Sequence, residues 1–87
     1  MKAKTNKKSA KRYTPDETYS WLRDRMTKLG YTSLEQVAAE TGINRGNIYR
    51  YFTQDQRPSV ALMEPLCQVL KVSPQALLIG LGVWDRN

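Results

Sequence analysis

The stretch "AAETGINRGNIYRYF", residues 38–52, constrains the fold of this chain more than any other part of it. Ala38 is a small residue, Gly42 follows four positions later, and Ile48 stands ten positions after Ala38. Two helices that cross over a three-residue turn need a small residue at the crossing, a positive φ at the reversal and an aliphatic side chain between them. The spacing therefore predicts a helix-turn-helix unit over residues 33–52, with Val37, Ile43 and Tyr51 completing its inner face.

Start and stop signals around this unit predict further helices. Thr14, Pro15 and Glu17 form a cap, a first helical proline and an acid three positions after the cap, which predicts a helix over residues 15–29. The next helix begins at a capping box made by Thr32 with Glu35 or Ser33 with Gln36, and ends before Gly42. A third helix, capped by Asn44, covers residues 44–52.

Two more helices are expected after the polar loop "TQDQRPS". Ser59 can cap a helix over residues 60–71, in which Pro65 either introduces a kink or marks the true first turn. Ser73 and Pro74 open a last helix over residues 75–84, which two glycines weaken after Ile79. The predicted fold class is therefore all-α, a five-helix bundle.

The positive charge is concentrated at the amino terminus. Of the net charge of +6, all is carried by residues 1–15, while residues 16–87 hold eight basic and eight acidic side chains. Residues 1–13 are polar and nearly free of aliphatic side chains, so we expect a disordered basic arm in front of a domain over residues 14–87. In the domain, Arg45 and Arg50 form a local positive stripe.

Composition argues against several classes of protein. Eighty-seven residues make one small domain, and no apolar run approaches the roughly 20 residues that span a bilayer. With a single cysteine, Cys67, and no histidine, the usual zinc sites and the hydrolytic triads lack their side chains. We therefore expect a cytoplasmic protein that is not an enzyme, has no metal or other cofactor, and does not contact membranes.

Residues 20–82 resemble the phage-repressor and Cro (XRE) type of helix-turn-helix domain, on "LRDRMTKLGYTSLEQVAAETGINRGNIYRYF" and "LCQVLKVSPQALLIG". The resemblance implies a sequence-specific transcriptional regulator, a repressor of phage, prophage or bacterial origin, that inserts residues 44–52 into the major groove of double-stranded DNA. The stretch "GINRGNIYRYF" is also similar to the recognition helix of the tetracycline-repressor family. That family adds a large ligand-binding domain, which 87 residues cannot supply.

The sequence departs from the phage-repressor pattern at two places. An arginine and a glutamate that usually form a partly buried ion pair correspond to Met26 and Phe52. Because both partners are replaced together, no charge is stranded, and the double change favours the same fold. The usual glutamine at the start of the second helix is Leu34, which leaves base contact by the first recognition position open.

The resemblance and the helical spacing together give a set of candidate contacts. Base contacts are expected from Arg45, Gly46, Tyr49 and Arg50, with a solvated face or phosphate contact as the alternative. Ser33 and Asn44 are candidate phosphate contacts or simple caps. The remaining phosphate contacts are expected from Asn47, Thr53, Gln54, Gln56 and Arg57. In the arm, Lys7, Lys8, Lys11 and Arg12 either follow the DNA into a neighbouring groove or form a solubilising tail.

The carboxyl-terminal segment, residues 74–87, is more apolar than the end of a small domain needs. Ile79, Leu81, Val83 and Trp84 are expected to form the interface of a homodimer whose half-sites lie about one helical turn, ~34 Å, apart. Alternatively, Trp84 folds back onto the core. Two rival functions use the same fold: an antitoxin-like module that mainly binds a protein partner, and an RNA-binding domain.

Overall fold

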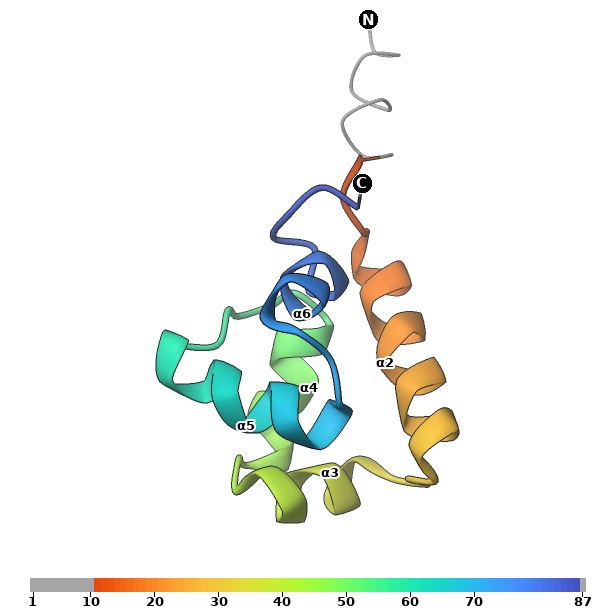
Figure 1. The fold of residues 1–87 in the computed structure, drawn as a ribbon, viewed down its shortest axis with the longest axis vertical. Coiled ribbons are helices and arrows are strands. Elements are labelled where there is room, and N and C mark those ends of the chain that lie inside the picture. Colours follow the sequence, from red (N-terminus) through yellow and green to blue (C-terminus); the bar gives the residue numbers. More distant parts are fainter. Residues whose placement is uncertain (1–10, 87) are drawn as a thin grey trace, which may run out of the picture.

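The computed structural model describes residues 11–86. Figure 1 shows α2 along one side of the molecule, α5 on the other side and α4 between them, with α3 across one end and α6 toward the end that carries both termini. No strand occurs in this part of the chain, so the prediction of an all-α fold with five helices is confirmed. The helices are α2 (Pro15–Leu29), α3 (Leu34–Thr41), α4 (Arg45–Phe52), α5 (Val60–Leu70) and α6 (Pro74–Gly80).

Helix α2 has the predicted ends. The Thr14 hydroxyl accepts a hydrogen bond from the Glu17 N–H at 3.2 Å, and the Glu17 carboxylate accepts one from the Thr14 N–H at 2.9 Å. This reciprocal capping box satisfies two backbone donors that the helix would leave unpaired. Gly30 ends the helix in the left-handed region, with φ 86°.

The turn between α3 and α4 is built from the residues that predicted it. Ser33 caps α3 by accepting the N–H of Gln36 at 3.4 Å, as one of the two expected boxes requires. The Gln36 side chain, however, accepts from the backbone N–H and the hydroxyl of Thr32, so the reciprocal half of that box is not formed. Gly42 adopts φ 77°, a conformation that costs other L-residues about 1 kcal/mol or more. The Asn44 side chain then caps α4 by accepting the N–H groups of Gly46 at 2.8 Å and Asn47 at 3.3 Å.

Helix α5 runs without a break from Val60 through Pro65, so the proline lies inside the helix and does not mark its first turn. Ser59 occupies the N-cap position, but its side chain makes no capping hydrogen bond. At the other end the Arg25 guanidinium donates to the carbonyl of Leu70 at 2.9 Å, which satisfies one of the last carbonyls of α5. This role of Arg25 is not apparent from the sequence, because Arg25 and Leu70 are 45 positions apart.

Helix α6 is shorter than predicted. It ends at Gly80 instead of continuing to Trp84. Gly82 takes φ 82°, which no right-handed helix accommodates, so the chain turns away and continues as an irregular tail. The sequence predicted only a weaker helix after Ile79, whereas the helix ends one residue later.

The core joins all five helices. Leu22, Ile48, Phe52 and Leu66 are fully buried, and the indole of Trp21 stacks on Phe52 with 6.3 Å between ring centroids. Met26, at 8% exposure, belongs to the same core cluster as Phe52. The two positions that usually carry an ion pair in the resembling family are thus occupied by packed apolar side chains. Burial of each large one contributes about 1.5–3 kcal/mol.

Candidate nucleic-acid interface

Helix α4 has one buried face and one exposed face. Ile48 and Phe52 are fully buried and Tyr51 is 6% exposed, so they attach the helix to the core. Arg45 and Arg50 lie on the solvent side. The core therefore holds α4 as a rigid support for its exposed side chains, as recognition through a major groove requires.

Arg45 has a partner that the linear sequence did not reveal. Its Nε lies 3.1 Å from the Glu35 carboxylate of α3, and the two side chains are 54% and 68% exposed. An ion pair this exposed contributes at most about 1 kcal/mol to stability. It therefore orients the Arg45 side chain but is weak enough for Arg45 to exchange Glu35 for another partner. Glu35 places a negative charge beside the amino end of α4.

Arg50 reaches further back along α4 than its position indicates. A Cβ atom built on Gly46 would lie 3.3 Å from the Arg50 Nη1, so the guanidinium rests over Gly46 in the first turn. The angular spacing had suggested that only Arg45 serves the leading end of the helix. Because Gly46 lacks a side chain, the Arg50 guanidinium can lie against the first turn of α4, the turn that Arg45 begins.

Tyr49 connects the exposed face of α4 to α2. It is 47% exposed, and its ring meets the Tyr19 ring edge to face at 6.0 Å between centroids. The two rings line a shallow hollow of about 260 Å³ together with Pro15, Asp16 and Thr53. The amino end of α2 therefore lies beside the carboxyl half of the exposed face of α4.

Several candidate phosphate contacts already serve the fold. The side-chain oxygens of Ser33 and Asn44 cap their helices, so the capping alternative is confirmed for both residues. Phosphate contact through their other atoms stays a prediction. Asn47 is half-buried in the first turn of α4, and Gln56 is exposed. The Thr53 hydroxyl donates to the carbonyl four residues earlier at 2.9 Å, which leaves its oxygen as an acceptor only.

Gln54 and Arg57 point to the body of the protein, unlike the other candidates. The Gln54 amide donates to the carbonyl of Tyr13 at 2.9 Å and to the buried hydroxyl of Thr18 at 2.8 Å. One guanidinium nitrogen of Arg57 donates to the carbonyl of Leu81 at 2.8 Å. Both Nε2 hydrogens of Gln54 are thus engaged within the protein, which opposes a direct phosphate contact by that amide. Arg57 is exposed and keeps other N–H donors, so its phosphate contact stays a prediction.

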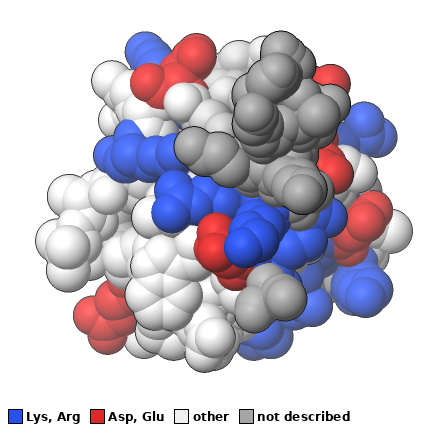
Figure 2. Space-filling view, turned by 90° about the horizontal axis from the view of Figure 1, so that it is seen from above, with Lys and Arg blue, Asp and Glu red and all other residues white. Residues whose placement is uncertain are grey.

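The base of the expected arm lies within the described residues. Lys11 and Arg12 are exposed, and the Arg12 Nε lies 3.3 Å from the Asp85 carboxylate. Lys7 and Lys8 lie outside the described residues. Viewed from the end of the molecule that carries both termini, Lys and Arg side chains gather on the surface with acidic side chains among them (Figure 2).

The tail contains one correction to the expected dimer surface. Leu81 is 1% exposed and belongs to the core, so it offers almost no area to a second chain. Trp84 is 48% exposed, which argues against its burial on the core, while Ile79 and Val83 are half-buried. An apolar groove of about 440 Å³ runs between α5, α6 and the tail, lined by Arg57, Pro58, Val60, Met63, Pro74, Leu78, Leu81 and Val83.

Two further observations concern the described residues as a whole. Along residues 11–86 no helix has the length and apolar character needed to cross a membrane. In the same part of the chain, no three His, Cys, Asp or Glu side chains are grouped in a way that would hold a metal ion.

Comparison with known proteins agrees with this geometry. A protein-family model described as helix-turn-helix (HTH_3) matches residues 22–77, which include all of α3, α4 and α5. The match gives no support to the second resemblance, to the tetracycline-repressor family. No curated protein and no solved structure matches the chain significantly. By the extent of the family match and the arrangement of its helices, this chain belongs to the XRE-type helix-turn-helix family of DNA-binding regulators.

Proposed function

We propose that this protein is a sequence-specific repressor that inserts α4 into the major groove of double-stranded DNA. The observation that carries the proposal is the pair of guanidinium groups, from Arg45 and Arg50, at the amino end of a helix whose opposite face is buried. Arginine is the side chain that fits guanine O6 and N7 with two hydrogen bonds. Gly46 permits close backbone approach, and Tyr49 is placed to contact a thymine methyl group.

Phosphate contacts would set the register of α4 on the duplex. Ser33 and Asn44 stand at the amino ends of α3 and α4, where unpaired backbone N–H groups favour anions. Asn47, Thr53 and Gln56 lie along or just after α4 on the same segment. These contacts carry affinity but no sequence information, so their loss should weaken binding about equally for all sequences.

The same proposal includes a homodimer that binds a two-fold operator. The groove between α5 and α6 supports it, because it is lined mainly by apolar side chains and bordered by Val60, which is 87% exposed. Trp84 lies on the tail that follows this groove. In a two-fold arrangement each chain would cover the groove of the other, and this would remove the groove and Trp84 of each chain from water. The rival function, a module that mainly binds a different protein, would use the same groove.

Selection from a pool of random duplexes tests the proposal. At two salt concentrations, the full chain should enrich a palindromic motif with half-sites about one helical turn apart, and the motif should survive the increase in salt. Weak binding that falls steeply with salt and enriches no motif would contradict sequence-specific recognition. Light scattering on the free chain separates the two uses of the groove: a dimer supports the repressor, and a monomer that binds no motif favours the protein-binding module.

A further inference from the structure

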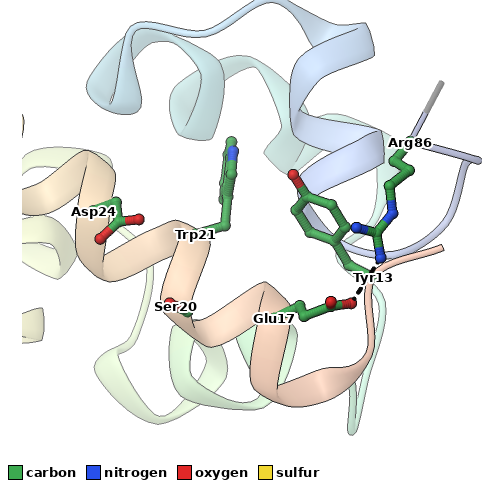
Figure 3. A pocket seen from close by; sticks show the side chains of 6 residues that line it. All are labelled: Tyr13, Glu17, Ser20, Trp21, Asp24 and Arg86. Atoms are coloured by element: carbon green, nitrogen blue, oxygen red, sulfur yellow. Dashed lines mark hydrogen bonds and ion pairs between the residues drawn. The ribbon is translucent and has the colours of Figure 1, made fainter. Parts of the chain in front are cut away.

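The carboxyl-terminal tail contacts residues 11–13, the segment at the base of the expected basic arm. The Arg86 guanidinium lies 3.0 Å from the Glu17 carboxylate and stacks over the Tyr13 ring at 5.0 Å from its centroid. The backbone N–H of Arg86 donates to the carbonyl of Lys11. Figure 3 shows the Arg86 side chain reaching from the tail to Tyr13 and to Glu17 at the start of α2.

Two other contacts hold the same segment. Arg12 pairs with Asp85, so the tail contacts the chain at Lys11, Arg12 and Tyr13 in succession. The Gln54 amide donates to the Tyr13 carbonyl, and Gln54 is the second residue after α4. We call this arrangement, made by Tyr13, Glu17, Gln54, Asp85 and Arg86, the arm clasp.

The arm clasp fixes where the charged amino-terminal residues leave the body. Its Tyr13 precedes α2 by two residues, and the amino end of α2 shares a hollow with Tyr49 and Thr53 on the exposed side of α4. All six cations of residues 1–15 precede Tyr13. A chain leaving the clasp therefore starts beside the carboxyl end of α4, opposite the end with Arg45, where its charges would meet phosphates that flank the bases read by α4.

We infer that Arg86 is a positioning residue for DNA binding: through the arm clasp it directs the basic arm to the DNA held by α4. The inference rests on the proposed function. Each contact is weak alone, because exposed ion pairs and single cation–π contacts contribute little. Together, however, these contacts hold three consecutive residues and restrict the directions in which the arm can leave the body. This restriction raises the effective concentration of the arm at the DNA.

A matched pair of variants of the full chain tests this inference. Arg86→Gln removes one positive charge and the clasp, whereas Lys71→Gln removes one exposed charge at the end of α5. Each is also made in a chain, called the neutralised-arm chain, whose four lysines before the clasp are replaced by Lys2→Gln, Lys4→Gln, Lys7→Gln and Lys8→Gln. Affinity for the selected operator is measured against salt concentration, and thermal unfolding checks that every variant is folded.

We expect Arg86→Gln to weaken binding roughly three- to tenfold and to reduce the salt slope by about 1, while Lys71→Gln changes both much less. In the neutralised-arm chain the effect of Arg86→Gln should largely disappear, which a purely structural role would not produce. Two results would overturn the role of Arg86 and leave the proposed function intact. One is that Arg86→Gln reduces affinity equally in both arm backgrounds, and the other is that it causes no loss in a chain that binds its operator. Failure of the unaltered chain to select any operator would overturn the proposed function together with it.

Discussion

The Glu35 carboxylate lies 3.1 Å from the Nε of Arg45, so the leading residue of the recognition helix is paired with an acid from the helix before it. The pair bridges the two halves of the helix-turn-helix unit on its solvent side. It orients one base-reading candidate, and in the proposed binding mode it also places a negative charge near the DNA phosphates. These two effects oppose each other in DNA binding, which makes the pair open to experiment.

Glu35→Gln should strengthen DNA binding several-fold at low salt, because removing a charge of the same sign as the phosphates lowers repulsion and frees the Arg45 guanidinium. Stability should fall by at most about 1 kcal/mol, as for other exposed pairs. Fluorescence anisotropy against an operator duplex measures the change. Glu64→Gln, on the exposed side of α5, is the charge-matched control, and equal gains from both variants would refute a specific role for Glu35.

Gly46→Ala should reduce DNA affinity while leaving the fold intact. The added Cβ would lie 3.1 Å from the Asn44 Oδ1 and 3.3 Å from the Arg50 Nη1, so both side chains must shift by a few tenths of an ångström and the Arg50 guanidinium is displaced from its place over Gly46. Better helix propensity, worth up to about 1 kcal/mol, offsets the crowding of the cap. Combined with Arg50→Ala, the substitution should cost much less affinity than it does alone. Additive losses would show that Arg50 does not depend on the space over Gly46.

Substitutions at Gly42 should destabilise the chain in the order valine, then alanine, then asparagine. With φ 77° and no atom within 4 Å of an added Cβ, the penalty comes from the backbone conformation and not from crowding. We expect about 1 kcal/mol for Gly42→Ala and a smaller loss for Gly42→Asn, since asparagine tolerates the left-handed region best. Urea unfolding measures each free energy. Equal losses for all three variants would contradict the backbone explanation.

The pH dependence of stability should contain a contribution from Glu17. Its pKa is lowered from the ordinary value of 4.5, first by the hydrogen bond from the Thr14 N–H and further by Arg86. A carboxyl group whose pKa is lower in the folded chain stabilises it above the unfolded pKa, and this stability is lost as pH falls through the lowered value. Glu17→Gln should therefore flatten the loss of stability below pH 4.5. Thermal unfolding curves from neutral to acid pH would show this, and an unchanged acid limb would contradict it.

Local signals made the helices and the turn predictable from sequence. Thr14, Gly30 and Gly42 act on backbone within four residues of themselves, so their roles follow from chemistry that spacing alone displays. The end of α6 was missed because glycines in sequence weaken a helix without fixing where it stops, and only the positive φ of Gly82 decides that.

Most of the site chemistry that sequence reasoning missed depends on packing between distant segments. Glu35 meets Arg45 only because α3 and α4 cross, and Arg57 turns inward because the tail brings the Leu81 carbonyl to it. The contact of Gln54 with Tyr13 joins residues 41 positions apart. Periodicity correctly placed Arg45 and Tyr49 on the exposed face of α4, but it contains no information on which side chains share a partner.

The most direct test of the account is a comparison of base preferences for the full chain and its Arg45→Ala variant, with Lys71→Gln as a charge-matched control, in selection from random duplexes. The account predicts that Arg45→Ala relaxes the preference at one position of each half-site, with a cost of about 1–3 kcal/mol for the lost contact, while the control keeps the original motif. An unchanged motif in Arg45→Ala, with only a uniform loss of affinity, would contradict base reading by the leading residue of α4.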